Sequence, residues 1–398
     1  MKKKISTIVA LMLAVSVVAM GCSSEPSTQT GSADASVEET QKNETKTDDE
    51  AKTSESVSEY PALKQADGQL VVGYIHGRND SEAIQRSARQ VTIEAAHRGW
   101  KLVDVTWNTD QETKDGIQNL INQNVDAILI GNCSSMDAKV DVVQAARQKG
   151  IGVYNLDNQN VEGVIANSTM PGGVAAMELL YAIGVDTNWN ANVGTIAAKA
   201  IGGHIERTFP IEGFLNGVYP NFKLLASEDM GDSQNPSQTA NDFAAAWLQK
   251  YGDDLDVVIG SADIIGMGAA EAVIKNGDSE GEKTICAGMD GGSQAWSYIR
   301  DNTPFQYSYA QPVELYAHNI MELIDQLQVQ GMKAGDDGCL ITHEGSVIYA
   351  NGMVVTRENV PDAGQSIHAV FNYYGEDPKD QDAWYNWTDG DGPYTITE

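Results

Sequence analysis

The feature that most constrains the fold is a repeated alternation of short apolar runs with helical patterns. From Gln69 onward, each run is rich in β-branched residues and is followed by a longer, mixed stretch. Apolar runs without polar alternation predict strands buried on both faces, as in a parallel sheet covered by helices. The runs occupy residues 70–75, 102–105, 127–130 and 152–156, and then 193–198, 224–227, 257–260 and 284–289.

The helical patterns follow these runs in the same two sets. They cover residues 81–98, 115–122 and 137–149 in the first set, and 211–218, 236–250, 264–275 and 293–300 in the second. A strand-like stretch at 161–166 and the pair Gly172-Gly173 interrupt the series midway. We therefore expect an α/β protein with two doubly wound parallel-sheet lobes. A single eight-unit α/β barrel is the alternative arrangement.

The first 21 residues are typical of an export signal. Lys2, Lys3 and Lys4 precede an apolar stretch that runs to Met20 and ends in Gly21-Cys22. A basic start and a short apolar core predict a cleaved secretory signal rather than a transmembrane helix. Gly21-Cys22 resembles a bacterial lipobox, although Ala19 stands where leucine is usual. The resemblance predicts a lipid-modified Cys22; an ordinary signal peptide with a chance cysteine is the alternative.

Residues 22–66 are expected to be an acidic tether. Within residues 23–59 there are ten acidic residues against three lysines and no aromatic residue. Such a segment buries too little apolar surface to offset its conformational entropy. A tether of this kind is common beneath lipid-anchored proteins of Gram-positive bacteria, so we expect an extracytoplasmic location.

Charge and cysteine content exclude several classes of protein. The formal net charge of −30 argues against nucleic acid as a partner, because phosphate recognition needs a basic surface. After Cys22 there remain Cys133, Cys286 and Cys339, an odd number with no histidine at metal-ligand spacing. We expect free thiols, no metal and no cofactor. Nucleophile-elbow, zinc-protease and phosphate-loop motifs are absent, so no enzyme class is indicated.

Six short motifs occur in a fixed order along residues 70–356. They are NVDAILI at 124–130, VYNLDN at 153–158, Gly213-Phe214, SAD at 261–263, AGMDG at 287–291 and YAQP at 309–312. This ordered set resembles the type I periplasmic sugar-binding proteins, the ribose- and galactose-binding family of ABC transporters. The resemblance implies two lobes joined by a three-strand hinge that crosses near Asn167, Gln311 and Ile341.

The resemblance also implies that each lobe is made of two chain segments. The first lobe would combine residues 67–168 with 312–340, and the second 169–311 with 341–360. Residues 361–398 would extend beyond the usual end of the family. This extension is acidic but carries several aromatic residues, so we expect it to pack on a lobe.

Polar residues follow many of the expected strands. In open α/β sheets, ligands bind beyond the carboxyl ends of the strands. The resemblance places Asp157, Asp263, Asp290 and Gln311 in contact with a ligand. Carboxylates accept hydroxyl protons, and amide and guanidinium groups supply donors, as a sugar requires. The candidate ligand-binding residues are His76, Arg78, Asn79, Asn132, Asp157, Asn158, Arg207, Asp263, Asp290 and Gln311.

Three of the candidates also have a structural explanation. Asp263 and Asp290 stand where they could cap the following helix, and His76 could be a loop residue. The sequence also departs from the family pattern. Ala83 and Ile84 stand where an aromatic pair is usual, and Asn158 stands where arginine is usual. The remaining candidates for stacking on a ligand are Trp107, Phe209 and Trp296, which could equally be core residues.

The sequence favours a lipid-anchored solute-binding protein that delivers a small polar ligand, a monosaccharide or polyol, to an ABC permease. We expect it to be a monomer without catalytic residues. A sensor of the same fold that signals to a membrane kinase or chemoreceptor is an alternative. A secreted carbohydrate-active enzyme that uses Asp263 and Asp290 as paired carboxylates is another. A sugar-responsive repressor is excluded by the export signal and the acidity.

Overall fold

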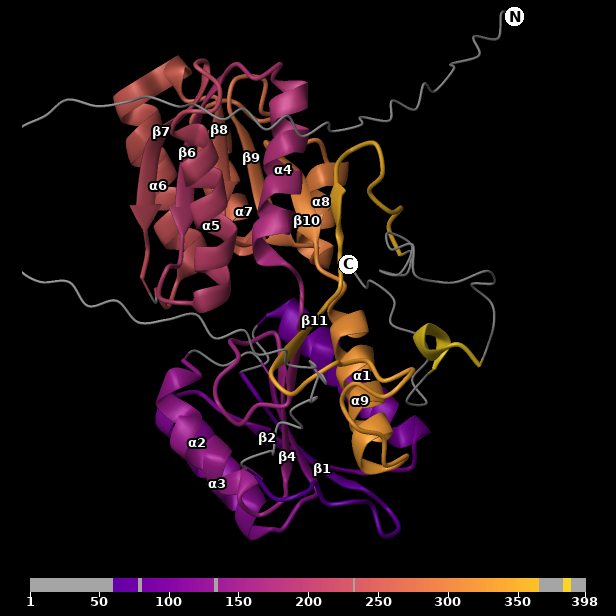
Figure 1. The fold of residues 1–398 in the computed structure, drawn as a ribbon. Helices are drawn as coiled ribbons and strands as arrows, with labels where there is room; N and C mark the ends of the chain where they lie inside the picture. Colours follow the sequence, from indigo (N-terminus) through magenta and orange to yellow (C-terminus); the bar gives the residue numbers. More distant parts are fainter. Residues whose placement is uncertain (1–59, 78–80, 132–134, 232, 365–381, 388–398) are drawn as a thin grey trace, which may run out of the picture. The chain divides into compact units, whose positions relative to one another are not determined.

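The computed structural model describes residues 60–77, 81–131, 135–231, 233–364 and 382–387. The expected signal peptide, Cys22 and most of the expected tether lie outside these residues. The described residues form two α/β lobes, each built on a six-stranded sheet (Figure 1). The expectation of two doubly wound lobes is confirmed, and the single barrel is excluded, because the strands form two separate sheets.

The first lobe contains an all-parallel sheet with the strand order β11-β5-β4-β3-β1-β2. All five residues of β3 are buried, as its unbroken apolar sequence predicts, and all five of β4 are buried although one of them is Asn155. The strands are β1 (Val71–His76), β2 (Lys101–Thr106), β3 (Ala127–Gly131), β4 (Gly152–Leu156), β5 (Ala166–Thr169) and β11 (Ser346–Tyr349).

The second lobe repeats this plan with the order β12-β10-β9-β8-β6-β7. Its strands are parallel except for the edge strand β12, which runs antiparallel to β10. They are β6 (Ala191–Ala197), β7 (Phe222–Asp229), β8 (Val257–Gly260), β9 (Ile285–Asp290), β10 (Phe305–Ala310) and β12 (Met353–Val355).

Helices cover both faces of each sheet. In the first lobe, α1 (Glu82–His97) and α9 (Val313–Gln328) pack on one face, and α2 (Asp110–Asn122) and α3 (Val140–Arg147) on the other. In the second lobe, one face carries α4 (Gly172–Asp186) and α5 (Gly202–Leu215), and the other carries α6 (Pro236–Tyr251), α7 (Asp263–Lys275) and α8 (Ser293–Arg300). Short 3-10 turns occupy Asp137–Lys139, Gly252–Asp254 and Trp384–Asn386.

Local sequence signals explain where some helices begin. The second helix starts five residues earlier than its apolar pattern indicates, because Thr109 and Glu112 form a reciprocal capping box. The glycine pair expected to interrupt the series is instead the first turn of α4. The inner face of α4 packs on the sheet and on α5, whereas Val174, Tyr181 and Val185 of the same helix are exposed.

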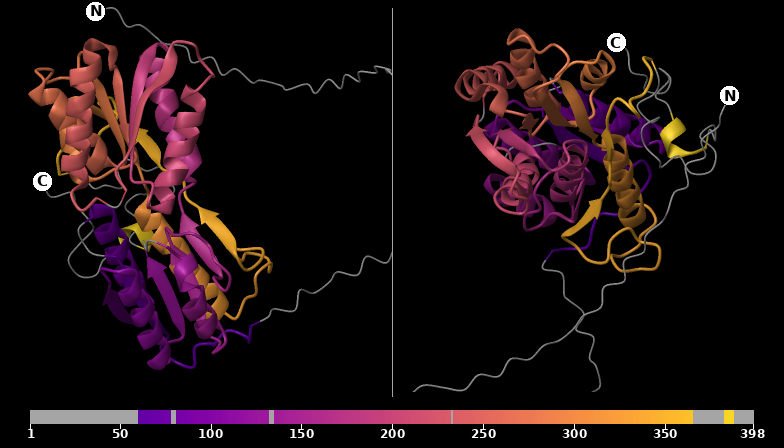
Figure 2. Two further views of the ribbon diagram at one scale, coloured as in Figure 1. Left: turned by 90° about the vertical axis from the view of Figure 1, so that its left-hand side faces the viewer. Right: turned by 90° about the horizontal axis from the view of Figure 1, so that it is seen from above.

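The chain passes between the lobes three times (Figure 2). The passages lie between β5 and α4, between β10 and α9, and between β11 and β12. The third passage corrects an expectation. It falls at residues 350–352 rather than near Ile341, because β11 pairs with β5 in the first lobe. Residues 341–349 therefore belong to the first lobe, and residues 346–355 form two strands in two sheets.

Gly352 is required at the third passage. Its backbone N–H donates to the Tyr309 hydroxyl at 2.9 Å. A β-carbon at this position would collide with the carbonyl oxygen of Ala310. The close approach of the two segments therefore leaves room for no side chain.

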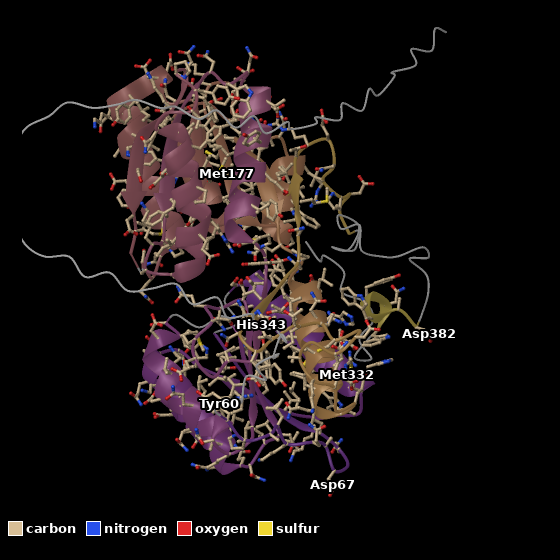
Figure 3. The ribbon with its side chains drawn as sticks, viewed as in Figure 1. Tyr60, Asp67, Met177, Met332, His343 and Asp382 are labelled. Atoms are coloured by element: carbon tan, nitrogen blue, oxygen red, sulfur yellow. The ribbon has the colours of Figure 1, made fainter. Side chains whose placement is uncertain are left out.

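The start of the described chain corrects a second expectation. Residues 60–66 were expected in the tether, but they pack along the first lobe, where Figure 3 labels Tyr60. The backbone N–H of Lys64 donates to Gly150 at 2.8 Å, and that of Ala66 donates to Gln328 at 2.8 Å. The Arg147 guanidinium lies 5.1 Å from the centre of the Tyr60 ring. These contacts fix the segment on the lobe.

The described part of the C-terminal extension packs on the first lobe, as expected. The ring of Trp387 stacks on His97 at 3.6 Å, and the ring of Trp384 stacks on His318 at 4.4 Å. Both histidines belong to the α1–α9 face. Figure 3 labels Asp382 at the start of this fragment. Within the described residues, no helix is both long and apolar enough to cross a membrane.

Candidate functional site

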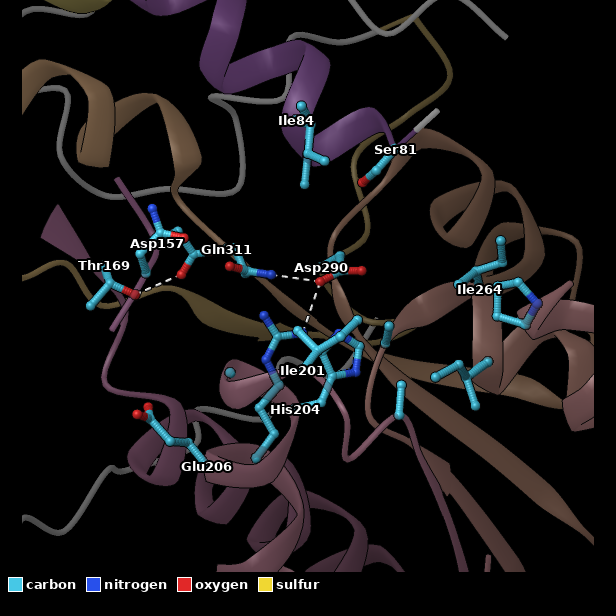
Figure 4. Close-up of a pocket in the computed structure, with 18 of the residues that line it drawn as sticks. Ser81, Ile84, Asp157, Thr169, Ile201, His204, Glu206, Ile264, Asp290 and Gln311 are labelled. Atoms are coloured by element: carbon cyan, nitrogen blue, oxygen red, sulfur yellow. Dashed lines mark hydrogen bonds and ion pairs between the residues drawn. The ribbon is translucent and has the colours of Figure 1, made fainter. Parts of the chain in front are cut away.

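A cavity of about 1180 Å³ lies between the two lobes and is lined by residues of both. Asp157, Asn158 and Thr169 reach it from the carboxyl ends of β4 and β5. Asp290 reaches it from the end of β9, and Arg207 from α5 (Figure 4). The sheets thus deliver polar groups to one place, as expected for open parallel sheets.

A three-residue network lies in the cavity, formed by Arg207 and Asp290 of the second lobe and by Gln311 of the passage between β10 and α9. The Arg207 guanidinium donates to Asp290 Oδ1 at 3.0 Å, and Gln311 Nε2 donates to the same oxygen at 2.5 Å (Figure 4). Arg207 also donates to the carbonyl oxygen of Ser261 at 3.0 Å. Both bonds fall on Oδ1, so the network leaves Asp290 Oδ2 as the acceptor to be offered to a ligand hydroxyl.

Two of the carboxylates that line the cavity sit on unusual backbone. Asp157 has φ of 55° and Asp290 has φ of 152°. Non-glycine residues adopt such values rarely and at a cost, and the surrounding structure must hold them there. The strained backbone thus occurs at two strand ends that line the cavity.

The loop that carries Asp290 is fixed from within its own lobe by Asp263. Asp263 Oδ2 accepts the backbone N–H of Gly291 at 2.8 Å and that of Gly292 at 3.2 Å. Asp263 Oδ1 accepts the Ser308 hydroxyl at 2.7 Å. Asp263 is buried and does not line the cavity, which corrects the expectation that it faces the ligand. It does not cap α7 either.

The same loop is also fixed from the first lobe, by two residues of α1. Arg86 donates to the carbonyl oxygens of Gly291 at 3.3 Å and Gln311 at 3.2 Å, and it pairs with Glu314 at 2.7 Å. Glu82 accepts the backbone N–H and the hydroxyl of Ser293, both at 2.8 Å. A carboxylate at the N-terminus of α8 is favourable for the helix dipole. The first lobe therefore helps to position the ligand-facing edge of the second.

The first lobe orders its own polar edge. The Thr169 hydroxyl donates to Asp157 Oδ1 at 2.7 Å, and Asn158 Nδ2 donates to the carbonyl oxygen of Ile130 at 2.7 Å. Asn167 Nδ2 donates to the carbonyl oxygen of Asn158. These bonds fix the direction in which the β4 carboxyl end presents its side chains.

Two residues of α5 line the cavity although sequence reasoning did not select them. His204 Nδ1 is paired with the Ser261 hydroxyl at 2.7 Å, and burial and the nearby Arg207 charge lower the pKa of His204 to about 3. Glu206 is exposed and lies opposite Asp157. Burial and the Asp157 carboxylate raise the pKa of Glu206, against the opposing effect of Arg207. The signal that could have identified both residues is their position next to Arg207, which the sequence analysis did select.

Burial and neighbouring charges also shift the pKa values of Asp290, Asp263 and Arg207. Burial raises the pKa of Asp290, and the Arg207 charge opposes this shift. Burial and the Asp290 charge raise the pKa of Asp263. Although burial disfavours the charged guanidinium, Asp290 and Asp157 raise the pKa of Arg207 above its ordinary value. The guanidinium is therefore positively charged at every accessible pH.

Five of the predicted residues meet at the cavity: Asp157, Asn158, Arg207, Asp290 and Gln311. His76 does not. It is buried behind the strand end, where its ring contacts Gly77 and Asp104 and stacks on Tyr74. Asp263 is the other predicted residue that the described cavity does not include. Arg78, Asn79 and Asn132 lie outside the described residues.

The three residues that the sequence suggested for stacking on a ligand lie in three different places. Trp107 lines the cavity, whereas Trp296 is fully buried in the second lobe. Phe209 is exposed beside Lys199 and does not line the cavity. The apolar lining at the helix starts consists of aliphatic residues, among them Ile84, Ile201 and Ile264. Among the described residues, no cluster of three or more metal-ligating side chains occurs.

Comparison with solved structures supports this architecture. A solute-binding protein from Bacillus halodurans with bound myo-inositol has a TM-score of 0.63 and 18% identity, covering 74% of this chain and 97% of that one. A protein from Actinobacillus succinogenes with bound D-allose has a TM-score of 0.63 and 17% identity, covering 73% and 98%. At these identities the similarity establishes the fold alone.

A curated relative is the xylitol-binding protein of Mycolicibacterium smegmatis, which is 26% identical over 181 residues. The match covers 44% of this chain, and the chain spans about half the length of that relative. The model of the periplasmic binding protein domain matches residues 72–332, which is most of the two lobes. The chain therefore belongs to the periplasmic binding protein domain family.

Proposed function

We propose that the protein is the solute-binding component of an ABC transporter and that it captures a sugar or polyol between its lobes. The observation that carries the proposal is the Arg207–Asp290–Gln311 network, in which groups from α5, from β9 and from the second passage between the lobes meet at one carboxylate oxygen. Asp157 and Asn158 of the first lobe line the same cavity, so a hydroxylated ligand would find acceptors and donors from both lobes. Relatives that bind myo-inositol, D-allose and xylitol support the choice of ligand class.

The mechanism is a shift of population between open and closed lobes. A ligand that contacts both lobes binds the closed form more tightly and so favours it. A ligand that lacks one hydroxyl leaves a buried partner unsatisfied, which costs about 1–3 kcal/mol. Differences of that size are sufficient for selection among sugars.

A binding role also fits the state of the carboxylates. The enzyme alternative needs Asp263 and Asp290 to act as a pair on a substrate. Asp263 is buried and accepts three hydrogen bonds from the protein, and Asp290 is held by Arg207 and Gln311. We therefore assign binding and no catalysis to this site.

The proposal includes the location of the protein. A signal peptide at residues 1–21, a lipid on Cys22 and an acidic tether would hold a monomer at the outer surface of a bacterial membrane, next to its permease. Cys22→Ser should move the protein from the membrane fraction to the soluble fraction when the full chain is expressed in a Gram-positive host. Retention of the variant in the membrane fraction would contradict lipid anchoring.

Ligand binding is tested by thermal shift and calorimetry on the chain from residue 22 onward. A ligand at 100 times its dissociation constant stabilises the folded protein by about 2.7 kcal/mol, which is readily seen as a rise in melting temperature. Asp290→Asn should abolish the rise, and Asp253→Asn, a change in an exposed ion pair remote from the cavity, should leave it intact. A stable protein that responds to no sugar or polyol would refute the proposal.

A further inference from the structure

The cavity extends across the whole width of the sheet in the first lobe. This sheet has β2 at one edge and β11 at the other, and all its strands are parallel, so their carboxyl ends lie along one side. The cavity is lined at one end by Trp107, which directly follows β2, and at the other by Tyr349, the last residue of β11. Asp137, Asp157 and Thr169, which follow or end β3, β4 and β5, also line it.

The spacing of the strands gives the length of the cavity. Neighbouring strands lie about 4.8 Å apart, so the five steps from β2 to β11 correspond to about 24 Å. Closure of the lobes would change the height of the cavity but not this length, because hydrogen bonds fix the strands within the sheet. The volume of about 1180 Å³ also exceeds the range of about 300–1,000 Å³ that is usual for small-ligand pockets. One sugar ring would therefore fill only part of the cavity.

The polar side chains form a row that leads toward the β11 edge. Figure 4 shows four labelled members of this row, in the order Asp290, Gln311, Asp157 and Thr169. The Thr169 hydroxyl donates to Asp157 at 2.7 Å, and Thr169 is the register partner of Tyr349 on the neighbouring strand. Tyr349 therefore lies two strands, or about 10 Å, beyond the strand that carries Asp157.

Tyr349 presents an aromatic ring at the end of this row. The residue is 61% exposed although it lines the cavity, and Val347 on the same face of β11 is 37% exposed and lines it too. An aromatic ring offers a large flat apolar surface, on which the C–H groups of one face of a sugar ring can pack. Trp107 at the opposite end is partly buried against the core of its lobe, so Tyr349 is the ring that is better placed to receive a sugar.

On the basis of the function proposed above, we propose that the ligand is a disaccharide and that Tyr349 forms a second sugar subsite. The first sugar unit would contact Asp290, Gln311 and Asp157. The distance of two strands leaves room for a second unit linked to the first, and this unit would stack on Tyr349. Tyr349 would thus be the residue by which the site distinguishes a disaccharide from a monosaccharide.

The test compares monosaccharides with their own disaccharides: D-glucose with cellobiose and maltose, D-xylose with xylobiose, and D-mannose with mannobiose. Calorimetry on the chain from residue 22 onward should give, for one of these sugars, a dissociation constant at least tenfold lower for the disaccharide, which corresponds to 1.4 kcal/mol. Tyr349→Ala should reduce this ratio at least threefold by weakening the binding of the disaccharide alone. Tyr349→Phe keeps the ring and should preserve the ratio.

Tyr181→Ala is the matched control. Tyr181 is 48% exposed on α4 and does not line the cavity, so its substitution should leave the ratio unchanged.

The outcomes separate the two proposals. Equal or tighter binding of every monosaccharide, or binding of xylitol or myo-inositol without binding of any disaccharide, would overturn the second subsite and leave the solute-binding function standing. A Tyr349→Ala variant that keeps the ratio, or that weakens both sugars by the same factor, would also overturn it. A folded protein that binds no sugar or polyol at all would overturn both proposals.

Discussion

The buried ion pair between Arg86 and Glu314 gives the most decisive test of how the site is held. Two hydrogen bonds join the groups: Nε to Oε1 at 2.7 Å and Nη2 to Oε2 at 2.9 Å. The two side chains are 0% and 3% exposed. Arg86 also donates to the carbonyl oxygens of Gly291 and Gln311, which flank the ligand-facing groups.

Replacing Glu314 by alanine should be strongly destabilising. The substitution removes the carboxylate and leaves a guanidinium buried in the interior. Breaking such a pair by removing one partner costs about 3–5 kcal/mol. Because proteins of this kind are stable by about 5–15 kcal/mol, the loss is a large fraction of the total. We expect the urea midpoint to fall accordingly, with the slope of the transition unchanged.

Two further variants isolate the cause. The double substitution Arg86→Met with Glu314→Leu removes both charges, fills similar volume and should recover most of the lost stability. Asp253→Ala removes a fully exposed ion pair with Lys283 and should leave the urea midpoint unchanged. A loss below about 1 kcal/mol in Glu314→Ala, or no recovery in the double variant, would refute the reasoning.

Three further predictions follow from individual contacts. Gly352→Ala should lower the melting temperature and weaken ligand binding together, because its β-carbon collides with Ala310 at the third passage; an unchanged protein by both measures would contradict this. The pKa of His204 in the folded protein is about 3, which lies below its ordinary value of 6.5. Between these two pH values only the unfolded chain gains a proton. His204 therefore contributes to the free energy of unfolding above pH 6.5, and this contribution is lost as the pH falls. Chemical denaturation should therefore show wild type losing about 2 kcal/mol relative to His204→Gln between pH 7.5 and 5, and a constant difference would exclude the titration. Trp387→Ala should release the C-terminal fragment from His97 and increase its cleavage by protease, without changing ligand affinity, because the fragment lies outside the cavity; unchanged cleavage would contradict the stacking.

The sequence by itself determined the two-lobed α/β architecture. Strands such as Ala127–Gly131 and Val257–Gly260 are buried along their whole length, and their unbroken apolar sequences encode that burial directly. The sequence also identified Asp157 and Asp290. Parallel strands place their carboxyl ends along one edge, so a polar residue just after such a strand must lie at that edge.

Only the tertiary structure decided which polar residues face the ligand. Asp263 and Asp290 both stand at strand ends, yet Asp263 turns inward to Gly291, Gly292 and Ser308 while Asp290 faces the cavity. The His76 side chain likewise turns away from the cavity, and its ring contacts Asp104 instead. The direction of each side chain depends on partners that lie far away in the sequence, and no local pattern records them.

The sheets that the last two strands join were also determined by the tertiary structure. Residues 346–355 contain two short apolar runs separated by Asn351-Gly352, and the two runs join different sheets, because β5 and β10 each leave an edge to be paired. Local periodicity fixes which face of an element is buried, whereas long-range packing fixes what that element meets.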